Sequence, residues 1–199
     1  MANFESELIR SVQERFKVLA HADPDDLDPI SAVRDGFCDP VRLFIKNEPH
    51  SMEKLSDGRL RLISSCSITD EIVAKLIFGN QVYVECINHK TIPSKPGAGI
   101  STDEQHSDLW DYVRPWVEQS SSTDVKSWDW TFGAWLFRLC MDCHYVKTNT
   151  VRGSYYSDVC EAWLAAATRT LFATSHGALC FLTFLGLMKS GMFPTAYFN

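Results

Sequence analysis

The sequence reads Val41-Arg-Leu-Phe-Ile-Lys46 and, after a polar connection that contains Pro49 and Gly58, Arg59-Leu-Arg-Leu-Ile-Ser64. Short runs of β-branched and other apolar residues bounded by Pro and Gly are typical of β-strands. We therefore expect two neighbouring strands that form a hairpin with a long connection.

Helical patterns surround these strands. Apolar residues recur at helical spacing from Phe4 to Leu19, which predicts an amphipathic helix. Thr69 is expected to cap a helix that runs to about Phe78, with Gly79 as its stop. Further helices are expected over 109–117 and 157–174, and an apolar strand from residue 178. Strands and helices mix along the chain, which favours the α+β or mixed α/β class.

The composition limits the function classes. The chain has 199 residues, of which 45% are hydrophobic and 22% charged, and this is ordinary for a globular protein. Its formal net charge of −6 excludes a wholly basic protein that coats nucleic acid, although local basic surfaces remain compatible. We find no secretory signal pattern and no apolar run long enough to cross a bilayer, so we expect a soluble intracellular chain with an ordered surface loop between Lys90 and Ser107.

Seven cysteines lie in mostly apolar contexts. The string Cys140-Met-Asp-Cys143-His144 matches a haem-attachment pattern and half of a zinc site. No second pair of cysteines or histidines lies at comparable spacing, so we expect reduced, structural cysteines here.

The first candidate site is the predicted hairpin. It carries Lys46, Lys54, Arg59 and Arg61, and alternate strand residues share a face, so Arg59 and Arg61 are expected to point the same way. Several cations that converge on one slot suit the binding of a triphosphate. The alternative interpretation is a solvent-exposed edge strand whose charged side chains prevent it from pairing with another chain.

The second candidate site is the pair Asp124 and Asp129, which lie among Val125, Trp128 and Trp130. A carboxylate in apolar surroundings is usually paired with a cation. This favours the interpretation that at least one of the two aspartates binds a divalent metal ion. Residues five apart in a strand face opposite ways, so the chain must turn between them if both serve one site.

The third candidate site is the string Ser190-Gly191-x-x-x-Thr195-x-x-x-Asn199. Gly191 permits a tight loop, and Thr195 and Asn199 are expected to share a helix face. A strand-to-helix turn with a capping serine is the alternative interpretation.

Taken in order, these three segments resemble motifs F, A and B of RNA-dependent RNA polymerases of positive-strand RNA viruses. The string Lys46-x-Glu-Pro-His50 followed by Arg59-x-Arg-Leu-Ile63 is most similar to sobemoviruses, barnaviruses and poleroviruses. A glycine-rich stretch at 96–101 is similar to a loop of that group. The resemblance implies a right-hand polymerase fold, with the N-terminal segment and fingers over 1–123 (motif F at 42–63) and the start of the palm, with a fingers insertion, over 124–199.

The resemblance also implies roles for individual residues. Asp124 would be the catalytic aspartate that binds Mg²⁺ or Mn²⁺ in two-metal nucleotidyl transfer. The phosphates of the incoming nucleotide would be held by Lys46, Lys54, Arg59 and Arg61. The ribose 2′-hydroxyl would be recognised by Asp129, Ser190, Gly191, Thr195 and Asn199. The implied partners are an RNA template and nascent strand, ribonucleoside triphosphates and other viral replication proteins in the host cytoplasm, including its membrane-associated replication complexes.

One departure from the family pattern is clear. The Gly-Asp-Asp string of motif C, which supplies further metal ligands, does not occur in the 199 residues. We therefore expect a C-terminally truncated polymerase that does not extend a primer by itself. The alternatives are a reverse transcriptase, which Asp129 and Asn199 disfavour, and a non-enzymatic RNA-binding scaffold of the replication complex.

Overall fold

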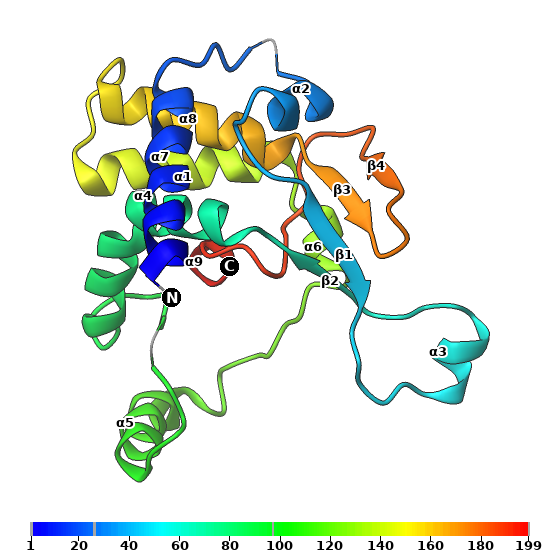
Figure 1. Ribbon diagram of the computed structural model, residues 1–199. Coiled ribbons are helices and arrows are strands. Elements are labelled where there is room, and N and C mark those ends of the chain that lie inside the picture. The colour runs from blue at the N-terminus through cyan, green and yellow to red at the C-terminus, as the bar shows by residue number, and fades with distance from the viewer. Residues whose placement is uncertain (1, 26, 97, 199) are drawn as a thin grey trace.

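A small mixed sheet lies at one side of the computed structural model, which describes residues 2–25, 27–96 and 98–198 (Figure 1). Its strand order is β2-β1-β3-β4, and β1 pairs antiparallel with β2 and parallel with β3, while β3 pairs antiparallel with β4. The strands are β1 (Val41–Ile45), β2 (Leu62–Ser65), β3 (Leu171–Thr174) and β4 (Leu179–Phe181). Both sides of the predicted boundary at 123/124 thus contribute strands to one sheet.

Helices make up most of the remaining structure. They are α1 (Ala2–Ala20), α2 (Pro29–Arg34), α3 (Met52–Ser56), α4 (Ile68–Ile87), α5 (Asp103–Val113), α6 (Trp128–Thr131), α7 (Ala134–Thr148), α8 (Tyr155–Thr168) and α9 (Thr195–Phe198), with a 3₁₀ turn η1 (Arg114–Trp116). The protein is therefore a mixture of helices and strands, in agreement with the expected class.

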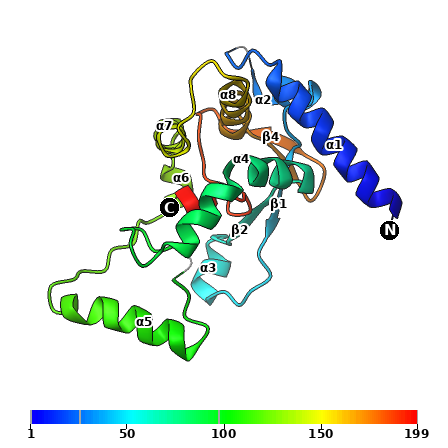
Figure 2. The ribbon, with the colours of Figure 1, turned by 90° about the vertical axis from the view of Figure 1, so that its left-hand side faces the viewer.

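Helix α1 packs on α4 and α8, and α7 packs on α8 (Figures 1 and 2). An ion-pair cluster supports the first contact, because the nearly buried guanidinium of Arg15 binds the carboxylates of Asp70 and Asp39. The backbone N–H of Asp39 donates to the second oxygen of Asp70, 2.9 Å away. Arg15 thus connects α1 to the start of α4 and to the segment that enters β1.

Aromatic side chains from distant helices meet in the main core. Phe78 of α4 is fully buried and makes edge contacts with His144 at 4.8 Å, Trp163 at 4.9 Å and Phe198 at 5.4 Å between ring centroids. Such edge-to-face pairs are favourable beyond the area they bury. Phe78 therefore joins α4, α7, α8 and α9 at one point.

The predicted helix over 4–19 and the strand from Val41 are confirmed. The second strand begins at Leu62 rather than Arg59, because the N–H of Arg59 donates to the carbonyl of Lys54 and closes the α3 turn. The antiparallel hairpin itself is confirmed.

Several predicted helix boundaries are wrong. Helix α4 begins after the N-cap Ser67 rather than Thr69 and runs through Gly79 to Ile87. A glycine inside a helix costs only about 1 kcal/mol, and the buried face that continues to Gln81 outweighs this cost. Helix α8 ends at Thr168, because the next residues form β3 against β1. Helix α7 was not predicted.

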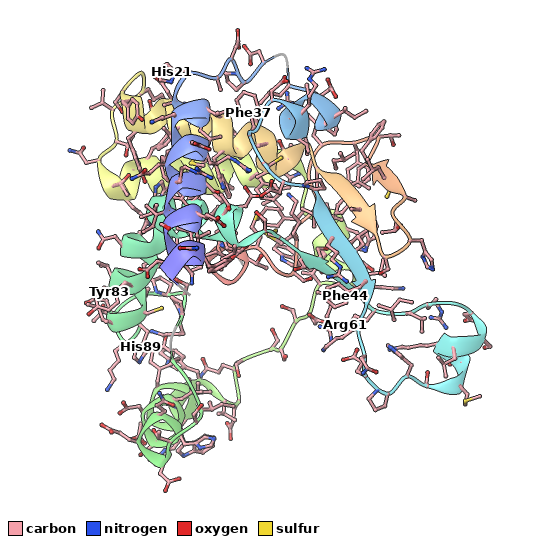
Figure 3. The ribbon with its side chains drawn as sticks, in the orientation of Figure 1. His21, Phe37, Phe44, Arg61, Tyr83 and His89 are labelled. Carbon is pink, nitrogen blue, oxygen red and sulfur yellow. The ribbon has the colours of Figure 1, made fainter. Side chains whose placement is uncertain are left out.

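The segment around α5 lies apart from the helical body (Figure 2). The Pro- and Gly-containing stretch before it is irregular, as expected. Helix α5 nevertheless begins at Asp103, inside the loop expected from Lys90 to Ser107 and before the helix start expected at residue 109, because Thr102 and Gln105 form a capping box there. Its aromatic residues Trp110 and Tyr112 are exposed, while Tyr83 and His89 mark the end of α4 from which this segment leaves (Figure 3).

The cysteines are all unpaired, and Cys140, Cys143 and His144 lie on α7 as structural residues. His144 is fully buried and bonds to Gln81 at 2.5 Å and to the Tyr156 hydroxyl at 2.8 Å. Burial lowers the pKa of His144 to about 4, so its ring stays neutral near pH 7. Among the described residues, no helix is both long and apolar enough to cross a membrane.

We predict that Phe78→Ala lowers the free energy of unfolding by about 3–5 kcal/mol, because it leaves a cavity where four helices meet. The matched control on the same helix is Leu76→Ala, whose side chain is exposed, and its effect is expected to stay near 0.5 kcal/mol. Urea denaturation of both variants measures the difference. Equal losses would contradict the central position of Phe78.

Candidate functional site

A cavity of about 720 Å³ lies beside the sheet and is lined by residues from all three stretches singled out in the sequence. Lys46 and Arg61 come from the hairpin, Asp129 from α6, and Ser190 from the loop before α9. Apolar side chains complete its wall, among them Leu43, Phe172, Leu187, Trp128 and Trp130. The volume is within the range of small-molecule sites, which usually combine apolar walls with a few polar groups.

The cationic part of the cavity is organised by one carboxylate. Glu48 forms an ion pair with Lys46 at 2.6 Å and a longer one with Arg61 at 3.8 Å. The hydrogen bond from Lys46 lowers the pKa of Glu48, so this carboxylate stays ionised near neutral pH. The ladder between the strands extends one step further, since the N–H of Lys46 donates to the carbonyl of Arg61 at 2.8 Å. Both cations are therefore held at one end of the hairpin, at the place where Figure 3 labels Arg61.

Lys54 and Arg59 do not line this cavity. They belong to the arm that carries α3, which projects away from the sheet (Figure 1). Arg59 is exposed and pairs with Glu53 and Asp57, each at 2.7 Å. The structure therefore brings two of the four predicted phosphate-binding cations to the cavity and leaves two on the arm.

Asp129 reaches the cavity because the chain turns just before it. Ser127 has a left-handed backbone with φ of 57°, and the short helix α6 follows. The sequence required a turn between Asp124 and Asp129 only if both residues serve one site, and of the two only Asp129 lines the cavity. The carbonyl of Asp129 accepts a hydrogen bond from the N–H of Met188 at 2.9 Å, which connects α6 to the segment before Ser190.

The expected apolar surroundings of Asp124 are wrong. Asp124 is exposed in an irregular segment, and the neighbouring Val125 is 51% exposed. The physical reason is that no described strand pairs with residues 119–126, so nothing covers them. Asp129, by contrast, is partly buried.

The loop of Ser190 and Gly191 lies directly against β2. The N–H of Ser64 donates to the Ser190 hydroxyl at 3.3 Å. A Cβ at Gly191 would lie 2.3 Å from the carbonyl oxygen of Ser64, a distance that only glycine avoids. The Thr195 hydroxyl donates to the carbonyl of Lys189 at 2.7 Å. Asn199, and with it the shared helix face predicted for Thr195 and Asn199, lies outside the described residues.

The comparisons with known proteins identify the family. A family model described as viral RNA-directed RNA polymerase matches residues 1–120. The chain belongs to the viral RNA-directed RNA polymerase family. It is 36% identical over 208 aligned positions to "Protein P1-P2" of pea enation mosaic virus-1, which covers 97% of this chain and 17% of that protein.

Two replicase polyproteins named P2AB also match nearly the whole of this chain and only a small part of their own length. Identity is 37% to that of Southern bean mosaic virus (94% of this chain, 20% of that protein) and 35% to that of cocksfoot mottle virus (95% and 20%). The chain thus spans about a fifth of the length of these curated relatives. The resemblance to polymerases of sobemoviruses and poleroviruses is confirmed. No solved structure matches this chain.

Two polar residues that hold the segment before α9 in place were not anticipated from the sequence, and neither of them lines the cavity described above. Lys189 is 3% exposed, and its ammonium donates to the carbonyl of Ala167 at the end of α8. Burial lowers the pKa of this amine. Glu71 of α4 accepts a hydrogen bond from the N–H of Phe193 at 3.2 Å. No spacing rule points to either residue, because both depend on how α4 and α8 pack beside the loop.

The described residues do not by themselves form a magnesium site. No three His, Cys, Asp or Glu side chains among them come close enough to hold a metal ion. A hard cation takes six or more oxygen ligands, several of them from protein carboxylates or waters. We therefore derive no metal-dependent step from the described residues alone.

We predict opposite effects for two glycine substitutions. Gly191→Ala should lower the free energy of unfolding by about 1–3 kcal/mol, because the added methyl group clashes with the Ser64 carbonyl and pushes the loop from β2. Gly79→Ala, which meets no atom within 4 Å inside α4, should raise it by about 0.5–1 kcal/mol. Chemical denaturation measures both. A neutral Gly191→Ala variant would show that the loop is not held against β2.

Proposed function

We propose that this chain forms the fingers and the first part of the palm of a right-hand RNA-directed RNA polymerase, and that its cavity binds an incoming ribonucleoside triphosphate. The observation that carries the proposal is the shared cavity of Lys46, Arg61, Asp129 and Ser190. These residues come from three stretches far apart in the sequence, and each stretch resembles a different motif of the family.

In this proposal the phosphates bind at the end of the hairpin. A guanidinium and an ammonium near each other match the charge of a triphosphate, and Arg can bind two oxygens at once. Lys54 and Arg59 would contribute when the arm that carries them approaches the bound phosphates. Glu48 competes for the same cations, so it sets how much positive charge is free for the ligand.

The ribose is proposed to lie near Asp129 and the loop of Ser190. The Ser190 hydroxyl accepts a bond from Ser64 and keeps its own proton to donate. Gly191 allows this loop to approach β2, and Thr195 fixes the backbone of Lys189. Together with Asn199, these groups would recognise the 2′-hydroxyl, which distinguishes RNA precursors from DNA precursors.

The proposed reaction is template-directed RNA synthesis for viral genome replication. The 3′-hydroxyl of the nascent strand attacks the α-phosphate, a new P–O bond forms, and pyrophosphate leaves. Mg²⁺ or Mn²⁺ would neutralise developing charge in the complete enzyme, with Asp124 as one ligand. Further carboxylates of the Gly-Asp-Asp kind are needed, and we propose that the 199 residues alone do not extend a primer. RNA template, nascent strand and other viral replication proteins are the proposed partners, in the host cytoplasm and its membrane-associated replication complexes.

Binding of ATP to the 199-residue chain tests the phosphate site. Lys46→Ala and Arg61→Ala should each weaken ATP binding by roughly tenfold, because hydrogen bonds to charged groups are stronger than neutral ones. Lys17→Ala, which removes the same charge from the exposed face of α1, is the control and should change little. Isothermal titration calorimetry at fixed salt measures the three affinities. Absence of ATP binding, or equal effects in all three variants, would refute the phosphate site.

Activity of the complete polymerase that carries this segment tests the palm residues. Asp124→Ala should abolish nucleotide incorporation, because the metal loses a ligand. Asp129→Ala and Asn199→Asp should instead retain RNA synthesis and reduce the preference for ribonucleotides over deoxyribonucleotides. Incorporation rates with both substrates separate the two effects. Near-normal turnover of Asp124→Ala would refute its assignment, and a wild-type preference for deoxyribonucleotides would favour a reverse transcriptase.

A further inference from the structure

Two tryptophans flank Asp129, and they have different surroundings. Residues two apart in a helix lie on nearly opposite sides, so α6 presents Trp128 and Trp130 in different directions. Trp128 packs on the core and makes an edge contact with Phe132, at 5.3 Å between ring centroids. Trp130, by contrast, is 57% exposed.

Exposure alone would not distinguish Trp130, since single exposed apolar residues are common on protein surfaces. Its position does, because Trp130 lines the same cavity as Lys46, Arg61 and Ser190. An indole face in a cavity that also holds two cations combines the two kinds of group that bind a nucleotide. Cations attract the phosphates, and aromatic rings stack on bases.

The backbone beneath Trp130 is fixed from both sides. The carbonyl of Asp129 accepts from the N–H of Met188 at 2.9 Å, and the carbonyl of Phe132 accepts from the N–H of Leu187 at 2.8 Å. Trp128 anchors the same turn to the core. Little backbone freedom is therefore lost when a ligand contacts Trp130, which favours binding at this position.

We propose that Trp130 is a stacking platform for a nucleobase in this cavity. The inference rests on the proposed function and adds a binding site for the base to the sites for phosphate and ribose. Every base has a π-face, so stacking on Trp130 would tolerate all four bases and favour the larger purines. The base can come from a free nucleoside triphosphate or from a single RNA strand.

Three ligands and three variants of the 199-residue chain test the proposal. The ligands are ATP, inorganic tripolyphosphate and an oligouridylate without a terminal triphosphate, with affinities measured by calorimetry. The variants are Trp130→Ala, Trp130→Phe, which keeps a stacking ring, and Trp116→Ala, a control with a similarly exposed indole on η1. Circular dichroism checks that each variant remains folded.

Trp130→Ala should weaken ATP binding by roughly 5- to 100-fold, as expected for the loss of one base–aromatic stack. Its affinity for tripolyphosphate should not change, Trp130→Phe should recover most of the loss, and Trp116→Ala should bind like the wild type. If only oligouridylate binding falls, Trp130 stacks on a strand rather than on the free nucleotide.

Two other outcomes separate the proposals. If Trp130→Ala binds ATP and oligouridylate as tightly as Trp116→Ala does, the stacking platform is refuted while the phosphate site remains. If the wild type binds none of the three ligands, the proposed function fails, and the stacking platform fails with it.

Discussion

The parallel pairing of β1 with β3 is the interaction on which the rest of this structure depends. Val41 lies opposite Phe172, and both pack with Leu187 in one buried cluster. A parallel pair cannot be closed by a tight turn, so the connection between the strands has to leave the sheet and return. Here that connection contains α4, α7 and α8, whose packing forms the main core. The pairing therefore joins the two parts of the chain and places their loops at one edge.

Once the sheet is formed, the loop before α9 has little freedom. Gly191 lies against the Ser64 carbonyl, Lys189 is directed to the end of α8, and Phe193 is bonded to Glu71 on α4. These contacts come from three different elements, namely β2, α8 and α4. The loop is therefore held by its neighbours and not by secondary structure of its own. A buried ammonium requires a hydrogen-bond acceptor, since an unpaired buried charge is costly. The position of Ser190 in the cavity follows from these contacts.

Local patterns predicted much of the secondary structure. The helix over 4–19 and the two hairpin strands follow from periodicity and from bounding turn residues within a few positions. Predictions failed where distant packing outweighed local preference, as at Gly79 inside α4 and at Thr168, where β3 replaces the expected helix. Exposure of Asp124 was also missed, because flanking apolar residues indicate burial only if another element covers them. Which cations line the cavity could not be predicted, since Arg59 binds carboxylates of its own arm.

The sequence by itself determined the family of this protein and the kind of chemistry its residues suit. The order and the spacing of polar residues can be read from the sequence without knowing how the chain packs. Only the tertiary structure decided that Lys46 and Arg61, but not Lys54 and Arg59, share a cavity with Asp129, Ser190 and Trp130. Contacts between residues more than a hundred positions apart depend on how strands pair and helices pack, and no local pattern encodes these distances.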